Sequence, residues 1–385
     1  MKDELQVAVI RPECSYLQGG AERYCMMLVK GLLSAGVKVI FIGARIDRHI
    51  QQEITFIDTG KRKGPSSLKN YLFHITVQQA LTRFPKAVSY SLSRTYPVDI
   101  YRLTDPLHSY HLHLNYRSPL KTLWRRLSIR HRLLLKLERN VLQGPKKAQR
   151  IVAISERESK LIKQFYNVNP KRIKVIYNGV DLTIFNPGRH EQGLSTRKQL
   201  KVQPEETLYL FAGMDFRRKG LEIVIRAAGL LKHPFKLIVA GSGDINRYKR
   251  LANRTGLAKN IRFLGRVQNM TDLYRAADLM VVPTQYDPFG NVHLESLACG
   301  LPIVTTIEAG GAEVVTHAKT GFIMKNPSDP MELATYMNEY EGQKAQWPEW
   351  RERAYNKAAE FTIEKNITQN LALIEDIARQ KQRVG

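Results

Sequence analysis

The chain has 385 residues, 43% of them hydrophobic and 25% charged, which excludes large-scale disorder and favours a globular protein of two domains. Its three cysteines are too few and too scattered for a disulfide framework or a zinc site, so a cytoplasmic location is expected. No window approaches about 18 uninterrupted apolar residues, so no membrane span is expected, and the start of the chain lacks the apolar core of a signal peptide.

Positive charge is concentrated in the first half of the chain. The net charge is +25, and residues 1–190 hold 33 Lys and Arg against 13 Asp and Glu, whereas the remainder holds 27 against 22. This asymmetry indicates a polyanionic partner, either a nucleic acid or an anionic membrane surface.

The first half of the sequence predicts a parallel α/β sheet. A strand at about 5–10, a helix at about 21–35 and a strand at about 37–43 form a βαβ unit. Further apolar strands are expected at about 87–90, 151–154 and 173–176, with helices between them. The turn-rich stretch NGVDLTIFNPG then indicates a linker.

The second half repeats this pattern. Strands are expected in TLYLFAG, FKLIVAGSG, IRFLGRV, LMVVPT, IVTT and TGFIM, and helices in LEIVIRAAGLL, MTDLYRAAD and MELATYMNEY. The fold class is therefore α/β, with two Rossmann-like, doubly wound domains facing each other across a cleft. Their expected bounds are 1–186 and 187–360, and a helix at 361–385 is expected to pack back on the first domain.

Two loops carry phosphate-binding features. Gly19 and Gly20 follow the first strand and open a helix, whose N-terminal N–H groups suit a phosphate. The three-glycine dinucleotide fingerprint is absent, and a simple helix-entry turn is the alternative. In GMDFRRKG, Arg218 and Lys219 follow the first strand of the second domain, where they form either a cationic clamp or a solvated basic turn.

The stretch YDPFGNVHLESLACG places Asp287 in a Pro-Gly turn and Glu295 in the following helix. Two such acids suit a general acid/base pair, a metal site, a sugar-nucleotide clamp, or simply a helix N-terminus that favours negative charge. A glycosidase pair leaves the neighbouring phosphate-binding loop unexplained, and the chain has no Asp-x-Asp motif for a metal. Carboxylates accept hydrogen bonds from vicinal hydroxyls, so metal-independent binding of a sugar nucleotide is favoured.

RLTDPLHSYHLHLN clusters Asp105 and His108 with two further histidines. A metal site is the weaker interpretation, because neither a cysteine nor a second acid is near. Contact of Asp105 and His108 with a sugar fits the turn at Pro106 better.

The segment 117–150 has 11 basic residues and one acid, with Trp124 and leucines interleaved at near-helical spacing. A basic amphipathic helix with a tryptophan is typical of membrane-surface segments, and a solvated helix packed on the sheet is the alternative. The expected membrane contacts are Arg117, Lys121, Trp124, Arg125, Arg126, Arg130 and Arg132.

These motifs together resemble the family 4 retaining glycosyltransferases of the GT-B fold. DPFGNVHLESLACGLPIVTT is similar to that family's EPFG-x(3)-LEA-x-A-x-G-x-P-VV signature, and GMDFRRKG is similar to its donor-phosphate clamp. DIYRLTDPLHSYHL and the basic segment resemble the subgroup of lipopolysaccharide-core glucosyltransferases. Where the family usually has Glu, this chain has Asp287, which is one methylene shorter and leaves the donor sugar open.

The resemblance implies a role for each motif. Arg218 and Lys219 would bind the donor diphosphate, and Gly19 and Gly20 would approach it from the other domain. Glu295 would hold the ribose hydroxyls, and Asp105 and His108 would lie near the transferred sugar. The other expected donor-binding residues are Asp287 and the N–H groups of Phe289, Gly290 and Asn291 for the sugar, and Arg266 and Val267 for the base.

The resemblance also implies a reaction. A hexose, with glucose favoured, would pass from a nucleoside diphosphate, with UDP favoured, to a lipopolysaccharide core or related glycolipid, with retention and without a metal or other cofactor. The protein would be a monomer at the inner face of the cytoplasmic membrane, with no nucleic-acid partner. The alternatives are a nucleotide-sugar epimerase or hydrolase of the same fold and a basic nucleic-acid-binding protein.

Overall fold

A computed structural model describes residues 5–15, 19–61, 64–115 and 128–384 and divides the chain into two compact units. Unit 1 comprises residues 1–178 and 363–385, and unit 2 comprises residues 179–362. The division at 178/179 comes before the predicted boundary at 186/187. The amide of Val180 donates to the carbonyl oxygen of Phe361 at 2.9 Å, so most of the expected linker already belongs to unit 2.

Unit 1 is built on a seven-stranded parallel sheet with the order β5-β3-β1-β6-β7-β8-β9. Its strands are β1 (Gln6–Ile10), β3 (Lys38–Gly43), β5 (Thr55–Asp58), β6 (Val88–Ser91), β7 (Ile100–Arg102), β8 (Arg150–Ala153) and β9 (Ile173–Val175). A separate pair joins β2 (Glu13–Cys14) to β4 (Arg45–Ile46). The central strands are buried, as expected for a parallel sheet covered on both faces.

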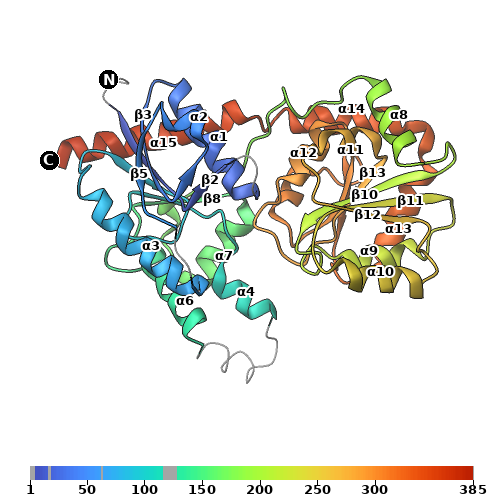
Figure 1. Cartoon of the computed structure of the whole chain (residues 1–385), viewed down its shortest axis with the longest axis horizontal. Helices are drawn as coiled ribbons and strands as arrows, with labels where there is room; N and C mark the ends of the chain where they lie inside the picture. Colours follow the sequence, from blue (N-terminus) through green and yellow to red (C-terminus); the bar gives the residue numbers. More distant parts are fainter. Residues whose placement is uncertain (1–4, 16–18, 62–63, 116–127, 385) are drawn as a thin grey trace. The chain divides into compact units, whose positions relative to one another are not determined.

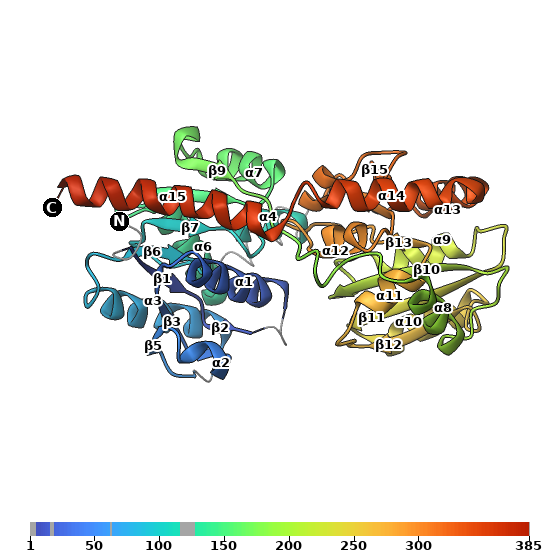
Figure 2. The same ribbon diagram turned by 90° about the horizontal axis from the view of Figure 1, so that it is seen from above.

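Helices cover both faces of this sheet (Figures 1 and 2). They are α1 (Gly20–Ser34), α2 (Arg48–Gln51), α3 (Ser66–Leu81), α4 (His108–Asn115), α6 (Ile129–Leu142), α7 (Glu156–Tyr166) and α15 (Ile363–Val384), with a 3₁₀ turn, η2, at Pro170–Arg172. Helix α15 packs against α1 and β6. The hydroxyl of Tyr24, on α1, donates to Asn366 at 3.0 Å, and that of Tyr90, on β6, donates to Asn370 at 2.5 Å. Helices α3 and α6 pack against each other.

Unit 2 has a six-stranded parallel sheet with the order β12-β11-β10-β13-β14-β15. Its strands are β10 (Thr207–Met214), β11 (Phe235–Ser242), β12 (Ile261–Gly265), β13 (Leu279–Val281), β14 (Ile303–Thr306) and β15 (Gly321–Met324). Helices α9 (Leu221–Ala228) and α10 (Ile245–Arg254) lie on one face, and α11 (Thr271–Ala276) and α12 (Val292–Ala298) lie on the other (Figure 1). Together with the seven-stranded sheet, this sheet confirms the predicted α/β fold of two Rossmann-like units.

The helices of unit 2 follow its strands in the expected alternation. They are α8 (His190–Gln199), α9 (Leu221–Ala228), α10 (Ile245–Arg254), α11 (Thr271–Ala276), α12 (Val292–Ala298), α13 (Pro330–Gly342) and α14 (Trp347–Ala358), with 3₁₀ turns η3 (Gly310–Val314) and η4 (Lys344–Gln346). Helices α9 and α13 pack on the sheet through a core that includes Phe211, Val224 and Met337. In the part of the chain that the structure describes, no helix is long and apolar enough to cross a membrane.

Each sheet has one point at which successive connections leave in opposite directions. In unit 1 this point lies between β1 and β6, and in unit 2 it lies between β10 and β13. Ligands of open α/β sheets bind beyond the carboxyl ends of the strands at such a point. The loops that follow these four strands are therefore where the candidate site residues have to be sought.

Candidate functional site

In unit 2, the loops after β10 and β13 lie in direct contact. Gly220 has a φ of +81°, and a Cβ at this position would lie 2.2 Å from the carbonyl oxygen of Pro283. The amide of Gln285 donates to the carbonyl oxygen of Arg218 at 2.8 Å. Glycine is therefore needed at position 220 both for its backbone conformation and for the close approach that joins the two loops.

The joined loops bring Arg218, Lys219 and Asp287 together. Nζ of Lys219 contacts Oδ2 of Asp287, and Nη1 of Arg218 lies 3.2 Å from the same oxygen. Nη1 of Arg218 also donates to the carbonyl oxygen of Tyr286 at 2.9 Å. Lys219 and Asp287 are both buried. The two predicted diphosphate-binding cations thus surround the carboxylate that was predicted to bind the donor sugar.

The charges of this cluster are closely coupled. Burial alone would raise the pKa of Asp287, but the positive charges of Lys219 and Arg218 outweigh burial and hold that pKa well below its usual range. Asp287 is therefore ionised and offsets part of the positive charge. Its Oδ1 accepts a hydrogen bond from the amide of Phe289 at 3.2 Å, one of the N–H groups expected to meet the sugar.

Glu295 lies on α12 and is buried. Its Oε2 accepts a hydrogen bond from the hydroxyl of Tyr274, on α11, at 2.9 Å. This bond fixes the orientation of the carboxylate that was predicted to hold the ribose hydroxyls. Tyr274 was not predicted from the sequence, because a tyrosine inside an apolar helical pattern is typical of a core residue.

A buried histidine supports the turn before α12. In His293, Nδ1 lies 2.7 Å from the carbonyl oxygen of Gly290 and Nε2 lies 2.7 Å from the hydroxyl of Thr305. Burial and the charge of Lys219 lower the pKa of His293 to about 4, so the ring is neutral at neutral pH. Because the carbonyl can only accept, Nδ1 carries the proton and Nε2 accepts from Thr305.

The other predicted donor-binding residues also lie in loops near strand ends. Gly290, with a φ of +81°, and Asn291 form the turn between β13 and α12. Arg266 and Val267 directly follow β12, the edge strand beside β11. Arg266 is exposed and Val267 is half-buried.

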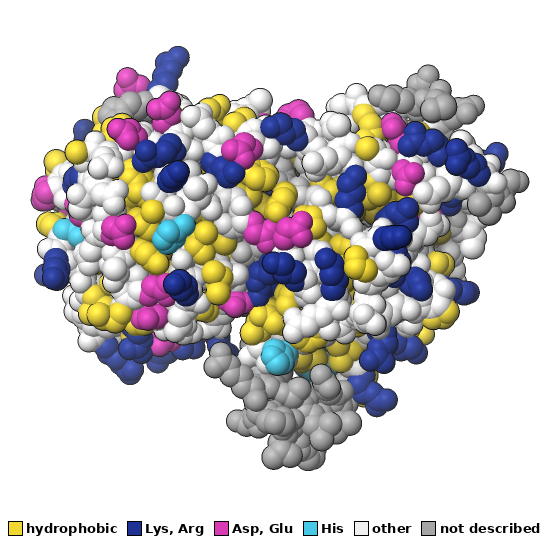
Figure 3. Space-filling model, turned by 180° about the vertical axis from the view of Figure 1, so that it is seen from behind, with side chains coloured by type: hydrophobic (Ala, Val, Ile, Leu, Met, Phe, Trp, Pro, Cys, Tyr) yellow, Lys and Arg dark blue, Asp and Glu magenta, His cyan; other side chains and the backbone are white. Residues whose placement is uncertain are grey.

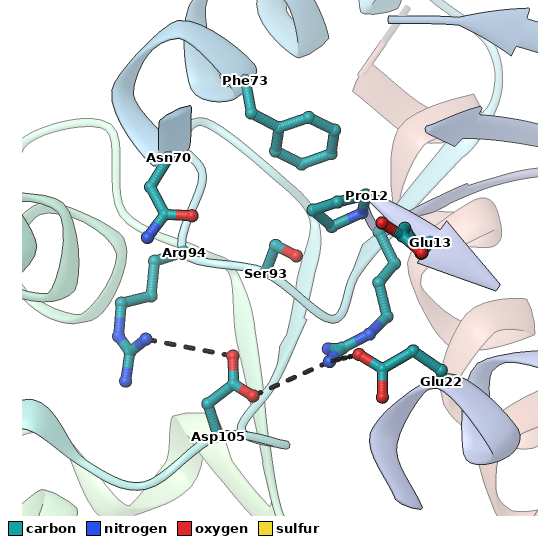
Figure 4. A pocket seen from close by; sticks show the side chains of 9 residues that line it. Pro12, Glu13, Glu22, Asn70, Phe73, Ser93, Arg94 and Asp105 are labelled. Carbon is teal, nitrogen blue, oxygen red and sulfur yellow. Dashed lines mark hydrogen bonds and ion pairs between the residues drawn. The ribbon is translucent and has the colours of Figure 1, made fainter. Parts of the chain in front are cut away.

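In unit 1, a cavity of about 280 Å³ opens where β1, β6 and β7 end (Figure 4). Its lining residues are Arg11, Pro12, Glu13, Glu22, Asn70, Phe73, Ser93, Arg94 and Asp105. The carboxylate of Asp105 lies between two guanidinium groups, 3.7 Å from Nη2 of Arg11 and 3.9 Å from Nη1 of Arg94. Asp105, predicted to lie near the transferred sugar, is thus part of a defined pocket.

The cations of this pocket are already paired. Nη2 of Arg11 lies 2.8 Å from Oε1 of Glu22, and its Nη1 donates to Thr104 at 3.0 Å. The lining contains three carboxylates and two guanidinium groups, although the first half of the sequence carries a large excess of positive charge. Carboxylates accept hydrogen bonds from hydroxyl groups, so the pocket suits an uncharged, hydroxyl-rich ligand better than an anion.

A fully buried carboxylate on α6 supports the pocket. Glu138 accepts hydrogen bonds from Nε of Arg94 at 3.1 Å and from the hydroxyl of Tyr166 at 2.6 Å. The backbone amides of His108 and Ser109 donate to it at 2.7 and 3.0 Å. Glu138 therefore holds the start of α4 and fixes the guanidinium that faces Asp105.

His108 takes a different position from Asp105. Its Nε2 lies 3.0 Å from Nδ1 of His131, and the two rings stack with centroids 5.1 Å apart. Burial lowers the pKa of His108 to about 4, although Glu138 opposes this shift, so the ring is neutral at neutral pH. The cavity lining does not include His108. Among the described residues, no group of three or more His, Cys, Asp or Glu could hold a metal ion.

Gly19 and Gly20 lie where α1 begins. A Cβ on Gly19 would be 2.8 Å from Oε2 of Glu22, which belongs to the first turn of α1 and pairs with Arg11. The helix start that was expected to approach a phosphate therefore carries a carboxylate held by an arginine.

The described part of the basic segment begins at residue 128. Within it, helix α6 covers Ile129–Leu142, and its Arg130 and Arg132 are exposed. On the face drawn in Figure 3, Lys and Arg side chains (dark blue) are spread over the described surface of unit 1. The predicted contacts Arg117, Lys121, Trp124, Arg125 and Arg126 lie outside the described residues.

Three charged residues of unit 1 were missed by the sequence analysis. Arg11 was not predicted as a site residue because it is a single charged residue directly after β1. Arg94 follows β6. Glu138 was treated only as the exception in a basic segment. For Arg11 and Arg94 the available signal was position, because residues that follow central strands of a parallel sheet face the ligand edge.

Two family models match the chain. Residues 194–381 match "Glycosyl transferases group 1", and residues 18–184 match "Glycosyltransferase Family 4". An uncharacterized glycosyltransferase of Methanocaldococcus jannaschii, MJ1607, is 32% identical over 228 residues, which are 58% of this chain and 57% of that protein. D-inositol 3-phosphate glycosyltransferase 2 of Catenulispora acidiphila is 32% identical over 203 residues, 49% of this chain and 47% of its own length. The chain thus spans about half the length of these relatives.

Solved structures share the fold at low sequence identity. WaaG, a glycosyltransferase involved in lipopolysaccharide biosynthesis, has a TM-score of 0.83 at 21% identity, with 96% of this chain and 99% of that chain covered. HepE of Anabaena in complex with UDP and glucose has a TM-score of 0.74 at 20% identity, with 97% and 100% covered. The two halves of the chain thus match two glycosyltransferase family models, and the chain has the GT-B fold of these solved glycosyltransferases.

Proposed function

We propose that the protein transfers a hexose, with glucose favoured, from a nucleoside-diphosphate sugar, with UDP favoured, to the sugar of a glycolipid such as a lipopolysaccharide core. The observation that carries this proposal is the cluster of Arg218, Lys219 and Asp287. It lies beyond β10 and β13, between which the strand order of the unit 2 sheet reverses. The similar structure of HepE in complex with UDP and glucose supports the choice of donor.

The donor diphosphate would take the place of Asp287 as the partner of Arg218 and Lys219. As the bond between the sugar and the diphosphate breaks, negative charge grows on the leaving phosphate, and two fixed cations stabilise that charge. Glu295 would accept hydrogen bonds from the ribose hydroxyls in the orientation that Tyr274 imposes. In this mechanism, which proceeds with retention, the leaving phosphate accepts the proton of the acceptor hydroxyl, and no metal takes part.

The acceptor sugar would bind in the pocket of unit 1. Its hydroxyls would donate to Asp105 and Glu22, and Phe73 offers an apolar face among the lining residues. This pocket favours a neutral sugar over inositol 3-phosphate, the acceptor suggested by the names of the Catenulispora relatives, because both guanidinium groups are paired with carboxylates. The basic face of α6 supports action at an anionic membrane surface. We propose that this surface is the inner face of the cytoplasmic membrane and that the protein acts there as a monomer.

Donor binding gives the first test. Among a panel of nucleotide sugars, UDP-glucose is expected to raise the melting temperature most, since a ligand at 100 times its dissociation constant adds about 2.7 kcal/mol. The measurement is a thermal melt in the presence of EDTA, with free UDP and glucose as controls. Stabilisation by no member of the panel would refute the donor assignment.

Transfer gives the second test. With the stabilising donor and truncated lipopolysaccharide cores, mass spectrometry should show the addition of one hexose in the presence of EDTA. Donor turnover without any acceptor would instead favour a hydrolase or epimerase. Faster transfer to inositol 3-phosphate would refute the glycolipid acceptor while leaving the donor assignment intact.

Tyr274→Phe is expected to raise the KM for the donor about tenfold, because the variant loses the hydrogen bond that orients Glu295. The ring and its packing are retained, so kcat should change less than KM. Steady-state kinetics with the donor varied provide the measurement. The hydroxyl of Tyr248, also a buried tyrosine of unit 2, supplies the matched control, and Tyr248→Phe should leave KM unchanged.

A further inference from the structure

The charged residues that line the cavity of unit 1 are largely partners of one another. Arg11 pairs with Glu22, and its Nη1 also donates to the carbonyl oxygen of Leu92 at 2.9 Å. Arg94 pairs with the buried Glu138. Most of the hydrogen-bonding capacity of these groups is therefore used within the protein, and the charged side gives the cavity a fixed shape.

Two uncharged side chains of the same lining are not used in this way. Within the part of the chain that the structure describes, the amide group of Asn70 and the hydroxyl of Ser93 have no hydrogen-bond partner. Both residues are half-buried. The amide offers two N–H donors and an acceptor oxygen, and the hydroxyl offers one donor and an acceptor oxygen. Hydroxyl groups of a sugar match both.

Ser93 is held by a fixed turn after β6. Its amide donates to Oγ of Ser91 at 3.2 Å, and its carbonyl oxygen accepts from the hydroxyl of Ser91 at 2.7 Å and from the amide of Thr95 at 2.8 Å. Ser91, the last residue of β6, is fully buried. The backbone of Ser93 is thus fixed while its hydroxyl stays available, so a ligand binds it without first having to order the loop.

Helix α3 places an aromatic ring beside the available amide. Asn70 and Phe73 are three residues apart on α3, which puts them on the same side of the helix. Figure 4 shows both at the upper side of the cavity, with Asp105 and Glu22 at the lower side. Within the described residues, the ring of Phe73 stacks on no other aromatic ring. It is therefore available to the C–H face of a sugar ring.

The two sides of the cavity differ in how strongly they discriminate between sugars. The side chain of Asp105 is exposed at 42%, so water can take the place of a sugar hydroxyl that is missing there. At the half-buried Asn70 and Ser93, a sugar without the matching hydroxyl leaves a polar group unpaired, which costs binding free energy.

The size of the cavity limits the ligand to one ring. Its volume of about 280 Å³ lies at the lower end of ligand sites, which begin at roughly 300 Å³. A single pyranose ring fits such a volume better than an oligosaccharide does. The residues that face this ring therefore decide which sugar is accepted.

We propose that Asn70, Ser93 and Phe73 determine the acceptor specificity of unit 1. Asn70 and Ser93 hydrogen-bond to two hydroxyls of one pyranose ring, and Phe73 packs on its C–H face. This assignment rests on the proposed function, which places the acceptor in this cavity. It adds α3 and the turn after β6 to the acceptor residues predicted from the sequence, and it leaves the charged residues with the task of holding the ring in place.

Binding in the absence of a donor tests these contacts on the full chain. The probes are the methyl α-glycosides of glucose, galactose and mannose, followed by saturation-transfer difference NMR and titration. One of the three should bind more tightly than the other two, and its saturation should be strongest at the protons of the C–H face that packs on Phe73. Equal binding of all three, or binding of none, would overturn the proposal.

Monodeoxy forms of the preferred glycoside identify the contacts one by one. With the unaltered chain, loss of the hydroxyl that meets Asn70 should weaken binding about tenfold, the usual effect of leaving one polar group unpaired. Asn70→Ala should weaken binding of the parent glycoside about tenfold and show no further loss with that deoxy form. Ser93→Ala should behave in the same way with a different deoxy form.

A matched control lies on the opposite side of α3. Gln79 is an exposed amide nine residues after Asn70, so Gln79→Ala should bind every glycoside like the unaltered chain. Asn70→Ala that keeps the full penalty for every deoxy form would contradict the contact. Phe73→Leu keeps an apolar side chain but loses the ring, so binding should fall about threefold or more. Because Phe73 is buried, a melting curve checks that this variant is folded.

Transfer kinetics separate this proposal from the proposed function. With the stabilising donor, Asn70→Ala and Ser93→Ala should raise the KM for the acceptor and leave the KM for the donor unchanged. If the unaltered chain binds a glycoside selectively but transfers no hexose to any acceptor, the proposed function is wrong and the binding residues stand. If transfer occurs and both variants keep the acceptor KM of the unaltered chain, the specificity assignment is wrong and the function stands.

Discussion

Lys219→Ala is expected to lower kcat for hexose transfer by about 10²–10³, the effect typical of removing one fixed group that stabilises charge in a transition state. Lys219 is buried and contacts Asp287, so its ammonium group cannot be replaced by a solvent cation at the same place. Steady-state rates with the preferred donor provide the measurement. The KM for the donor should rise as well, because the same cation binds the diphosphate in the ground state.

The neighbouring Arg217 is an exposed cation in the same loop and provides a matched control. Arg217→Ala should leave kcat within about twofold, since an exposed charge is screened by solvent. Full activity of Lys219→Ala would refute the role of the clamp. Lys219→Ala also leaves Asp287 with one cation fewer, so a melting curve of Lys219→Ala/Asp287→Asn is needed to separate lost chemistry from lost stability.

Much of the fold could be predicted from the sequence because the central strands are long or strongly apolar. Strands β1, β10 and β11 are recognisable in the sequence as long or strongly apolar runs, and each is followed by a helix of amphipathic or apolar character. Strand β9 was predicted although it is a half-buried edge strand of three residues, so neither length nor edge position alone explains why β5 and β7 were missed. Both are defined by pairing with neighbouring strands rather than by a local pattern.

The candidate site was predictable only in its residue types. The motif around Asp287 and the motif around Lys219 are each visible in the sequence, but 68 residues separate the two side chains. Their contact depends on the adjacency of β10 and β13, which are neighbours in the sheet without being consecutive in the chain. In unit 1, the pairing of Arg94 with Asp105 and Glu138 could not be predicted for the same reason, because α6 is a long way from β6 in the sequence.

Glu138→Ala is expected to lower the free energy of unfolding by about 3–5 kcal/mol, the usual effect of removing one partner from a buried ion pair. Glu138 is fully buried, and its loss leaves the guanidinium of Arg94 without its closest carboxylate and the amides of His108 and Ser109 without an acceptor. Urea unfolding followed by circular dichroism measures the change. Glu138→Gln retains an acceptor oxygen and should lose less stability than Glu138→Ala.

The same substitutions test whether Glu138 also shapes the acceptor pocket. Arg94 lies between Glu138 and Asp105, so releasing Arg94 should change the position of the Asp105 carboxylate. At a temperature where Glu138→Gln remains folded, its KM for the acceptor should therefore rise while its KM for the donor stays constant, because Arg218, Lys219 and Glu295, which are proposed to bind the donor, belong to unit 2. An equal rise in both KM values would indicate a general loss of folded protein, and unchanged stability of Glu138→Ala would contradict the structural role of this buried carboxylate.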